Sequence, residues 1–186
     1  MKVNHSNFIR QIAEYSAWIS EKLCKNLVNT SDEKFNQNIG SKFVNDTECP
    51  ASSLRSIIEH CMIGLEFGSH IIKSLAWDEN DIIQNFRLLT KEQLLERWIR
   101  QFIEFKQLLS DHIGKTVIFN DEEIYLGSDF FFAFFNHLTY HSGQFMIALK
   151  IVGEETIDLD YMTFLKEIRN NNFIRNLSTE SGKNKC

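Results

Sequence analysis

The feature that most constrains this chain is how few of its residues break helices. Its 186 residues include one proline, Pro50, and eight glycines. Because proline and glycine end helices and form the tight turns between short strands, their scarcity favours a small number of long helices. One domain is expected at this length, and a hydrophobic content of 43% is enough to form a core.

Four long stretches carry apolar residues at steps of three and four, the spacing that places them on one face of a helix. They run from Phe8 to Leu27, from Leu54 to Leu75, from Leu94 to Leu109 and from Phe130 to Val152. Ser52 or Ser53 can cap the second stretch, and Thr90 with Gln93 forms a capping-box pattern before the third. Gly153 follows the fourth as a stop signal. We therefore predict four long helices.

The remaining segments are polar or short. The connection between the first two helices is long, and a short fifth helix is expected from about Asp158 to Arg169. Residues 170–186 are rich in Asn, Ser and Lys and are expected to form a flexible tail. We predict an all-α fold, an up-down four-helix bundle over residues 1–169, with an irregular α-domain as the alternative.

Charge and cysteine usage narrow the possible partners and compartments. The formal net charge is −5, and no run of Lys and Arg stands out, so neither nucleic acid nor an anionic membrane is an expected partner. The four cysteines form no C-x-x-C pair and no regular framework, which favours a reducing compartment. The first residues form no apolar signal core, and no segment is apolar enough to span a bilayer. We therefore expect a cytoplasmic protein.

Two histidines lie on the apolar face of the fourth predicted helix. His137 and His141 are four residues apart, so they lie one turn from each other, in phase with Phe134 and Phe145. Buried imidazoles need polar partners, and one metal ion would satisfy a nitrogen from each. The alternative is a pair of core histidines bonded to the backbone or to each other.

A third histidine strengthens the metal interpretation. His60 falls on the flank of the apolar stripe of the second predicted helix, with Gly64 one turn further on, whereas His70 falls on its polar face. Leu138 follows His137, which excludes an H-E-x-x-H site, and no E-x-x-H sequence is present for a di-iron bundle. We predict a divalent metal site on His60, His137 and His141.

The segment NHLTYHSGQ, from Asn136 to Gln144, resembles the DinB-like (DinB/YfiT) family of metal-binding four-helix bundles. That family carries H-x-x-x-H followed by R-G-Q in its later long helix and a third histidine on its second helix. Ser142 stands here where arginine is common. The resemblance implies a nickel, zinc or similar ion on three histidines. Members with known activity include transferases and an isomerase that use low-molecular-weight thiols, and others are described only as metal-dependent hydrolases or DNA-damage-inducible proteins.

From this resemblance we expect a metal-dependent transferase that joins a low-molecular-weight thiol to a small-molecule substrate. The alternatives are a hydrolase at the same metal and a non-catalytic metal-binding stress-response protein. No general base is assigned. Glu59 and Glu66 are expected on the solvated polar face, and Cys61 is interpreted as core. Tyr140 and Gln144 can orient a ligand or a water molecule, although a structural role is favoured for each.

The fourth predicted helix also has a second apolar stripe. It consists of Phe131, Phe135, Leu138, Met146 and Leu149. In a monomer this stripe packs on a neighbouring helix, which is the default expectation. The number of aromatic residues makes a homodimer face the alternative.

Overall fold

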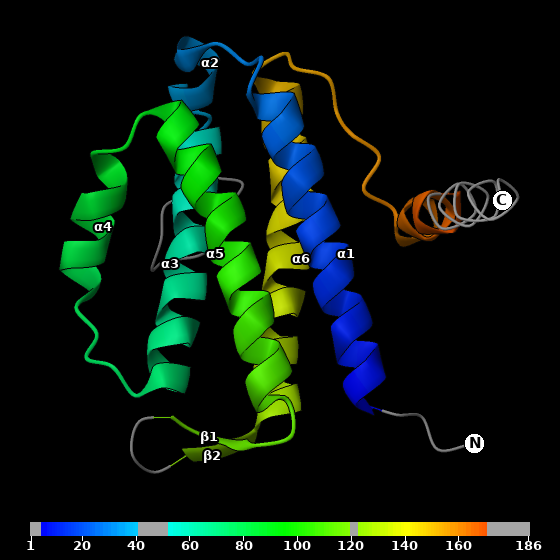
Figure 1. Cartoon of the computed structure of the whole chain (residues 1–186). Helices are drawn as coiled ribbons and strands as arrows, with labels where there is room; N and C mark the ends of the chain where they lie inside the picture. The colour runs from blue at the N-terminus through cyan, green and yellow to red at the C-terminus, as the bar shows by residue number, and fades with distance from the viewer. Residues whose placement is uncertain (1–4, 41–51, 120–122, 171–186) are drawn as a thin grey trace, which may run out of the picture.

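The computed structural model describes residues 5–40, 52–119 and 123–170. Helices account for 75% of these residues, which confirms the all-α prediction. Four long helices lie side by side (Figure 1). They are α1 (His5–Leu27), α3 (Leu54–Lys73), α5 (Lys91–His112) and α6 (Gly127–Ile151). Each corresponds to one predicted apolar stretch, and the Ser53 cap and the Thr90 capping box are both formed.

The long helices surround one core, because α1 and α3 each pack on both α5 and α6. Three phenylalanines lie at its centre. Phe105, Phe131 and Phe135 are fully buried, and Phe105 meets each of the other two edge to face. Aromatic pairs in this arrangement add to the stabilisation that burial alone provides. These three phenylalanines are therefore used inside the chain.

The order of helix directions differs from the predicted up-down alternation. Arg55, at the start of α3, donates to Leu89 O just before α5, and Lys91, at the start of α5, donates to Thr30 O just after α1. Both α3 and α5 therefore begin at the end where α1 finishes, and they run in the same direction (Figure 1). A further helix, α4 (Glu79–Arg87), returns the chain along the outside, and the sequence analysis missed it.

Shorter elements close the two ends. Near the end of α1, the one-turn helix α2 (Asp32–Asn36) buries Phe35 completely. Residues 41–51, which include Pro50, lie outside the described residues. At the opposite end, β1 (Thr116–Phe119) and β2 (Glu123–Leu126) form an antiparallel hairpin between α5 and α6, with Val117 opposite Tyr125.

A helical stretch over residues 161–170 follows α6 and packs on α1. It corresponds to the predicted short C-terminal helix. Phe164 is 1% exposed and its ring lies against Tyr15 and Trp18. Trp18 Nε1 donates a hydrogen bond to Glu167 Oε2 at 2.9 Å. The rest of the tail predicted over 170–186 lies outside the described residues.

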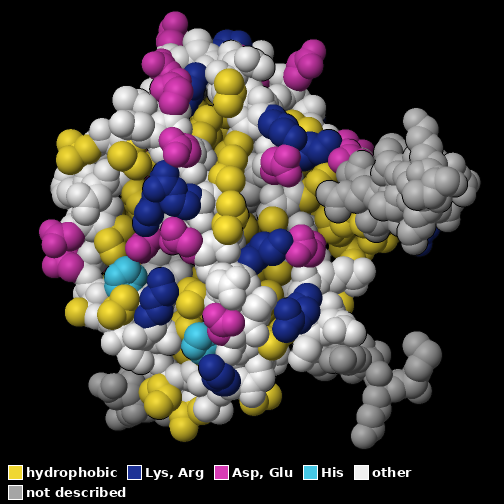
Figure 2. Space-filling view, in the orientation of Figure 1, with side chains coloured by type: hydrophobic (Ala, Val, Ile, Leu, Met, Phe, Trp, Pro, Cys, Tyr) yellow, Lys and Arg dark blue, Asp and Glu magenta, His cyan; other side chains and the backbone are white. Residues whose placement is uncertain are grey.

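The second apolar stripe of α6 is used within the chain. Phe131, Phe135 and Leu149 are fully buried, and Leu138 is almost so. Packing within one chain therefore accounts for this stripe, and the homodimer stays a prediction. Among the described residues, no helix combines the length and apolar character needed to cross a bilayer. The face formed by α1 and α5 carries charges of both signs, interspersed (Figure 2).

Candidate metal centre

The three predicted histidines meet where α3 and α6 pack together. His60 comes from α3, and His137 and His141 come from successive turns of α6. His137 Nε2 lies 3.2 Å from His60 Nε2 and 2.9 Å from His141 Nε2. The structure therefore brings together all three side chains that sequence reasoning selected, each with its Nε2 atom in the cluster.

The spacing of these nitrogens fits a shared metal ion. Imidazole nitrogens lie about 2.0–2.1 Å from zinc. Two of them separated by an angle between 90° and the tetrahedral value are then about 2.8–3.4 Å apart, and the observed 2.9 and 3.2 Å both fall in this interval. Within the described residues, these three histidines are the one group of at least three side chains suited to hold a metal. Neutral imidazole suits zinc, nickel, copper and iron alike.

Gln144 supports the most buried of the three histidines. His141 is 1% exposed, and its Nδ1 lies 2.6 Å from Gln144 Oε1. An amide oxygen only accepts, so His141 Nδ1 is the donor and carries the proton. The lone pair is then on Nε2, the atom that faces the other two imidazoles. Gln144 therefore holds His141 in the tautomer that a metal ligand needs.

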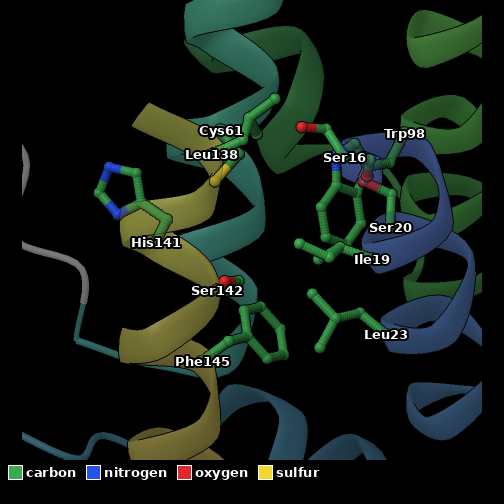
Figure 3. Close-up of a pocket in the computed structure, with 10 residues that line it drawn as sticks. All are labelled: Ser16, Ile19, Ser20, Leu23, Cys61, Trp98, Leu138, His141, Ser142 and Phe145. Carbon is green, nitrogen blue, oxygen red and sulfur yellow. The ribbon is translucent and has the colours of Figure 1, made fainter. Parts of the chain in front are cut away.

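The side chains between α6 and α1 are closely packed and leave little open space. A cavity of about 10 Å³ lies there, with Cys61, Leu138 and Phe145 among its walls. Figure 3 shows the His141 ring pointing away from α1, while Ser142 lies on the cavity side. The position where arginine is common in the resembled family is therefore turned toward α1, and Ser142 Oγ donates to Thr139 O.

The closed side also contains unsatisfied polar atoms. Ser16 Oγ and Trp98 Nε1 are buried and have no hydrogen-bond partner among the described residues. Both residues line the 10 Å³ cavity, which is about the volume that one water molecule needs. The interior beside the histidines therefore admits at most a single small molecule of solvent from this direction.

The side of α6 that faces α3 is open. A hollow of about 310 Å³ is lined by Gly64, Phe67, Ala133, Phe134 and His137. His60 and His137 are partly exposed, in contrast to His141. An ion held by the three nitrogens would therefore be accessible from this hollow, and a three-histidine site would leave coordination positions for a substrate or a water molecule.

The nearby carboxylates are engaged elsewhere. Glu59 is paired with Arg55 at 2.7 Å, and Glu66 accepts from Gln101 at 2.5 Å. Their side chains are 16% and 21% exposed, so the prediction that they are solvated is wrong. Neither belongs to the group of possible metal ligands. The sequence could not show the contact of Glu66, because Gln101 comes from another helix, whereas Arg55 and Glu59 are an i, i+4 pair on α3.

The remaining candidates are not ligands in this arrangement. Cys61 is buried, as predicted. His70 Nδ1 lies 2.9 Å from Glu66 O, outside the cluster. Tyr140 is 60% exposed, with its ring centroid 5.2 Å from that of His141. Burial, with a smaller effect from Glu21, raises the pKa of the Cys24 thiol to about 12, so this cysteine stays protonated and unreactive at neutral pH.

Comparison with known proteins agrees with the geometry. The DinB family matches residues 1–172 of the chain. No curated protein and no solved structure gives a significant match.

Proposed function

Because the chain belongs to the DinB family, we propose that it binds one divalent ion, zinc or nickel, on His60, His137 and His141. The observation that carries this proposal is the convergence of three Nε2 atoms at 2.9 and 3.2 Å. We also assign the four long helices to the four-helix bundle class, on the support that α1 and α3 each pack on α5 and α6.

We propose further that the protein is a transferase that uses a low-molecular-weight thiol. When bound, the ion would lower the pKa of a coordinated thiol or water molecule. His60, His137 and His141 hold the ion, Gln144 orients His141, and the hollow beside His137 admits the second substrate. In the reaction, the thiol loses its proton to solvent and its sulfur bonds to an electrophilic carbon. The leaving group departs with the electron pair of the broken bond; in an epoxide the ring oxygen keeps that pair, stays attached to the product and takes a proton from solvent.

One observation favours thiol transfer over hydrolysis. A hydrolase at the same ion benefits from a general base that takes a proton from water and returns it to the leaving group. Glu59 and Glu66, the carboxylates that α3 carries nearest to His60 in sequence, are held in ion pairs and hydrogen bonds. A thiol starts from an ordinary pKa near 8.5, far below that of water, so a thiol at the ion would depend less on such a base.

The test is a turnover assay on protein loaded separately with zinc and nickel. Thiols that include cysteine and bacillithiol are offered with chlorodinitrobenzene or an epoxide, and the loss of free thiol is followed. We expect turnover that requires both metal and thiol and that is absent from His137→Ala. Hydrolysis of an activated ester without thiol would instead identify the hydrolase. Stoichiometric metal without either reaction would identify the non-catalytic binding protein.

The composition supports a proposal about the cellular location and the class of substrate. We propose a cytoplasmic location and a small-molecule substrate, because the cysteines form no regular framework and no basic run is present. A homodimer is kept as a prediction for light scattering to test.

A further inference from the structure

The hollow beside His137 continues toward the hairpin. A second hollow of about 430 Å³ shares Phe67, Ala133 and Phe134 with the first. It adds Phe119 and Tyr125 from the hairpin and Asp129 and Phe130 from the start of α6. The two hollows form one groove, called here the α3–α6 groove, which runs from His137 at one end to the hairpin at the other.

The groove is open because two of its residues are small. A Cβ atom added to Gly64 would meet nothing within 4 Å, and Ala133 contributes only a methyl group. One turn along α3 the situation is reversed, because a Cβ on Gly68 would lie 2.9 Å from the Phe134 ring. The opening is therefore local, and it lies next to the histidine cluster.

We infer that the α3–α6 groove binds a flat aromatic small molecule that is neutral or cationic, with its reactive end at His137. This inference rests on the proposed function, since it assigns the class of the second substrate. Each hollow has the size of a small-ligand pocket, about 300–1,000 Å³. Continuity with His137 favours a ligand that reacts at the metal over a docked helix or a second copy of the chain.

The aromatic side chains suit a flat ligand. Phe67 meets Phe119 nearly perpendicularly at 5.9 Å between ring centroids, and Phe130 lies 4.9 Å from Phe134. Walls built from ring faces and edges stack on or meet the edge of another ring, which adds to the stabilisation from apolar burial. Aliphatic ligands gain the burial but not the ring contacts.

Charge narrows the ligand class further. Asp129 is the one charged residue among the described residues that line the groove, and it belongs to the hollow near the hairpin. No Lys or Arg is among the described lining residues. Near the hairpin end, a negative group on the ligand would meet the Asp129 carboxylate and no Lys or Arg among the described lining residues, which is unfavourable, while a positive group there would be attracted.

Two fluorescent probes with the same rings separate charge from shape. Phenylnaphthylamine is neutral, and anilinonaphthalenesulfonate adds one negative group. Both are titrated into metal-free and metal-loaded protein. We expect the neutral probe to bind one site per chain, with an affinity at least about ten-fold higher than that of the sulfonate. The affinity of the neutral probe should be similar with and without metal, because the aromatic walls do not depend on the ion.

Blocking variants test the location. Gly64→Leu and Ala133→Leu each place a larger side chain in the groove. We expect each variant to lower the affinity for the neutral probe at least about ten-fold. Gly143→Leu is the matched control, because its Cβ also meets nothing within 4 Å but it is exposed on α6 and lies outside the groove lining. We expect it to leave probe binding unchanged. Circular dichroism verifies that each variant is folded.

Several results would overturn the inference. They are equal affinity for the two probes, unchanged probe binding in both folded blocking variants, and self-association that expels the probe at high protein concentration. The proposed function fails separately, through absence of metal or of thiol-dependent turnover. Probe binding without turnover therefore supports the groove as a binding site and rejects the transferase. Turnover without probe binding supports the transferase and rejects the groove as a binding site.

Discussion

The two sides of α6 are built from similar residues but differ in how tightly they pack. Toward α1, large side chains such as Phe145 and Leu138 leave a cavity of only about 10 Å³. Toward α3, Gly64 and Ala133 leave hollows of about 310 and 430 Å³ between phenylalanine rings. The size of a few side chains at one helix pair, more than overall hydrophobicity, therefore determines where this protein is accessible.

The candidate metal ligands lie at the boundary between these two sides. His141 is buried and is held by Gln144, while His137 lines the open groove. Successive turns of α6 therefore carry one candidate ligand that is fixed by the core and another that lines open space. A metal centre needs both properties, since its ligands must be held rigidly and one side must remain accessible.

The largest expected difference between the two sides is in packing energy. Phe145→Ala removes a ring that is 1% exposed and should lower the free energy of unfolding by about 3–5 kcal/mol. Phe67→Ala removes a partly exposed ring from the groove and should cost about 1 kcal/mol. Urea denaturation of both variants measures the contrast. Equal losses would show that the groove is closed in solution.

The second prediction concerns the support of His141. Gln144→Ala removes the acceptor for His141 Nδ1, so we expect zinc affinity to fall about 10–100-fold. Gln144→Glu retains an acceptor at this position and should restore most of the affinity. Competition with a chromogenic chelator gives these values, and Tyr140→Phe is the control. An unaltered zinc affinity in Gln144→Ala would show that Gln144 does not support the metal centre.

Two glycines one turn apart on α3 should respond with opposite signs. At Gly68 an added Cβ lies 2.9 Å from Phe134 and 3.1 Å from Phe105, so Gly68→Ala should destabilise the protein by about 1–3 kcal/mol. At Gly64 an added Cβ meets nothing within 4 Å. Gly64→Ala should therefore stabilise the protein by about 0.5–1 kcal/mol, because alanine has the higher helix propensity. Thermal melts of both variants measure the difference, and stabilisation by both would mean that α3 packs more loosely than described.

The smallest effect lies far from the groove, where the C-terminal helical stretch packs on α1. Hydrogen bonds from Lys22 and then from Trp18 lower the pKa of Glu167 below its ordinary value of 4.5. The ionised form is thus favoured in the folded state, and this stabilisation is present at neutral pH and is lost as the pH falls through the lowered pKa. Trp18 fluorescence should stay constant down to about pH 4.5 and change below it.

The matched variant for this acid transition is Glu167→Gln, which has no carboxyl group to titrate. It should remove the transition below pH 4.5 while leaving the fluorescence of the other tryptophans unaltered. A transition centred near neutral pH in the unmodified protein would contradict the assignment.

Local patterns were sufficient to predict much of this molecule. Helix boundaries follow from apolar periodicity and caps such as Ser53 and Thr90, which depend on neighbouring residues only. The His137 and His141 pair and the flank position of His60 follow from helical phase in the same way. Such features were predicted because each is encoded within a few turns of one helix.

Features that depend on contacts between helices were not predictable. Helix α4 is short and buries only Phe86, so its pattern is weak, and without it the parallel direction of α3 and α5 cannot be inferred. The engagement of Glu66 by Gln101 joins residues 35 positions apart. The α3–α6 groove likewise depends on how two helices approach each other, so the position of Gly64 one turn beyond His60 did not reveal it.

The measurement that tests the account most directly is elemental analysis after exposure to zinc and nickel. It compares the unmodified protein with His60→Ala, His137→Ala and the control His112→Ala, whose Nδ1 lies 3.0 Å from Leu108 O outside the cluster. The account predicts about one ion per chain in the unmodified protein and the control, and none in the other two. An unmodified protein without metal, or metal retained in both His60→Ala and His137→Ala, would contradict it and reduce the histidines to core packing.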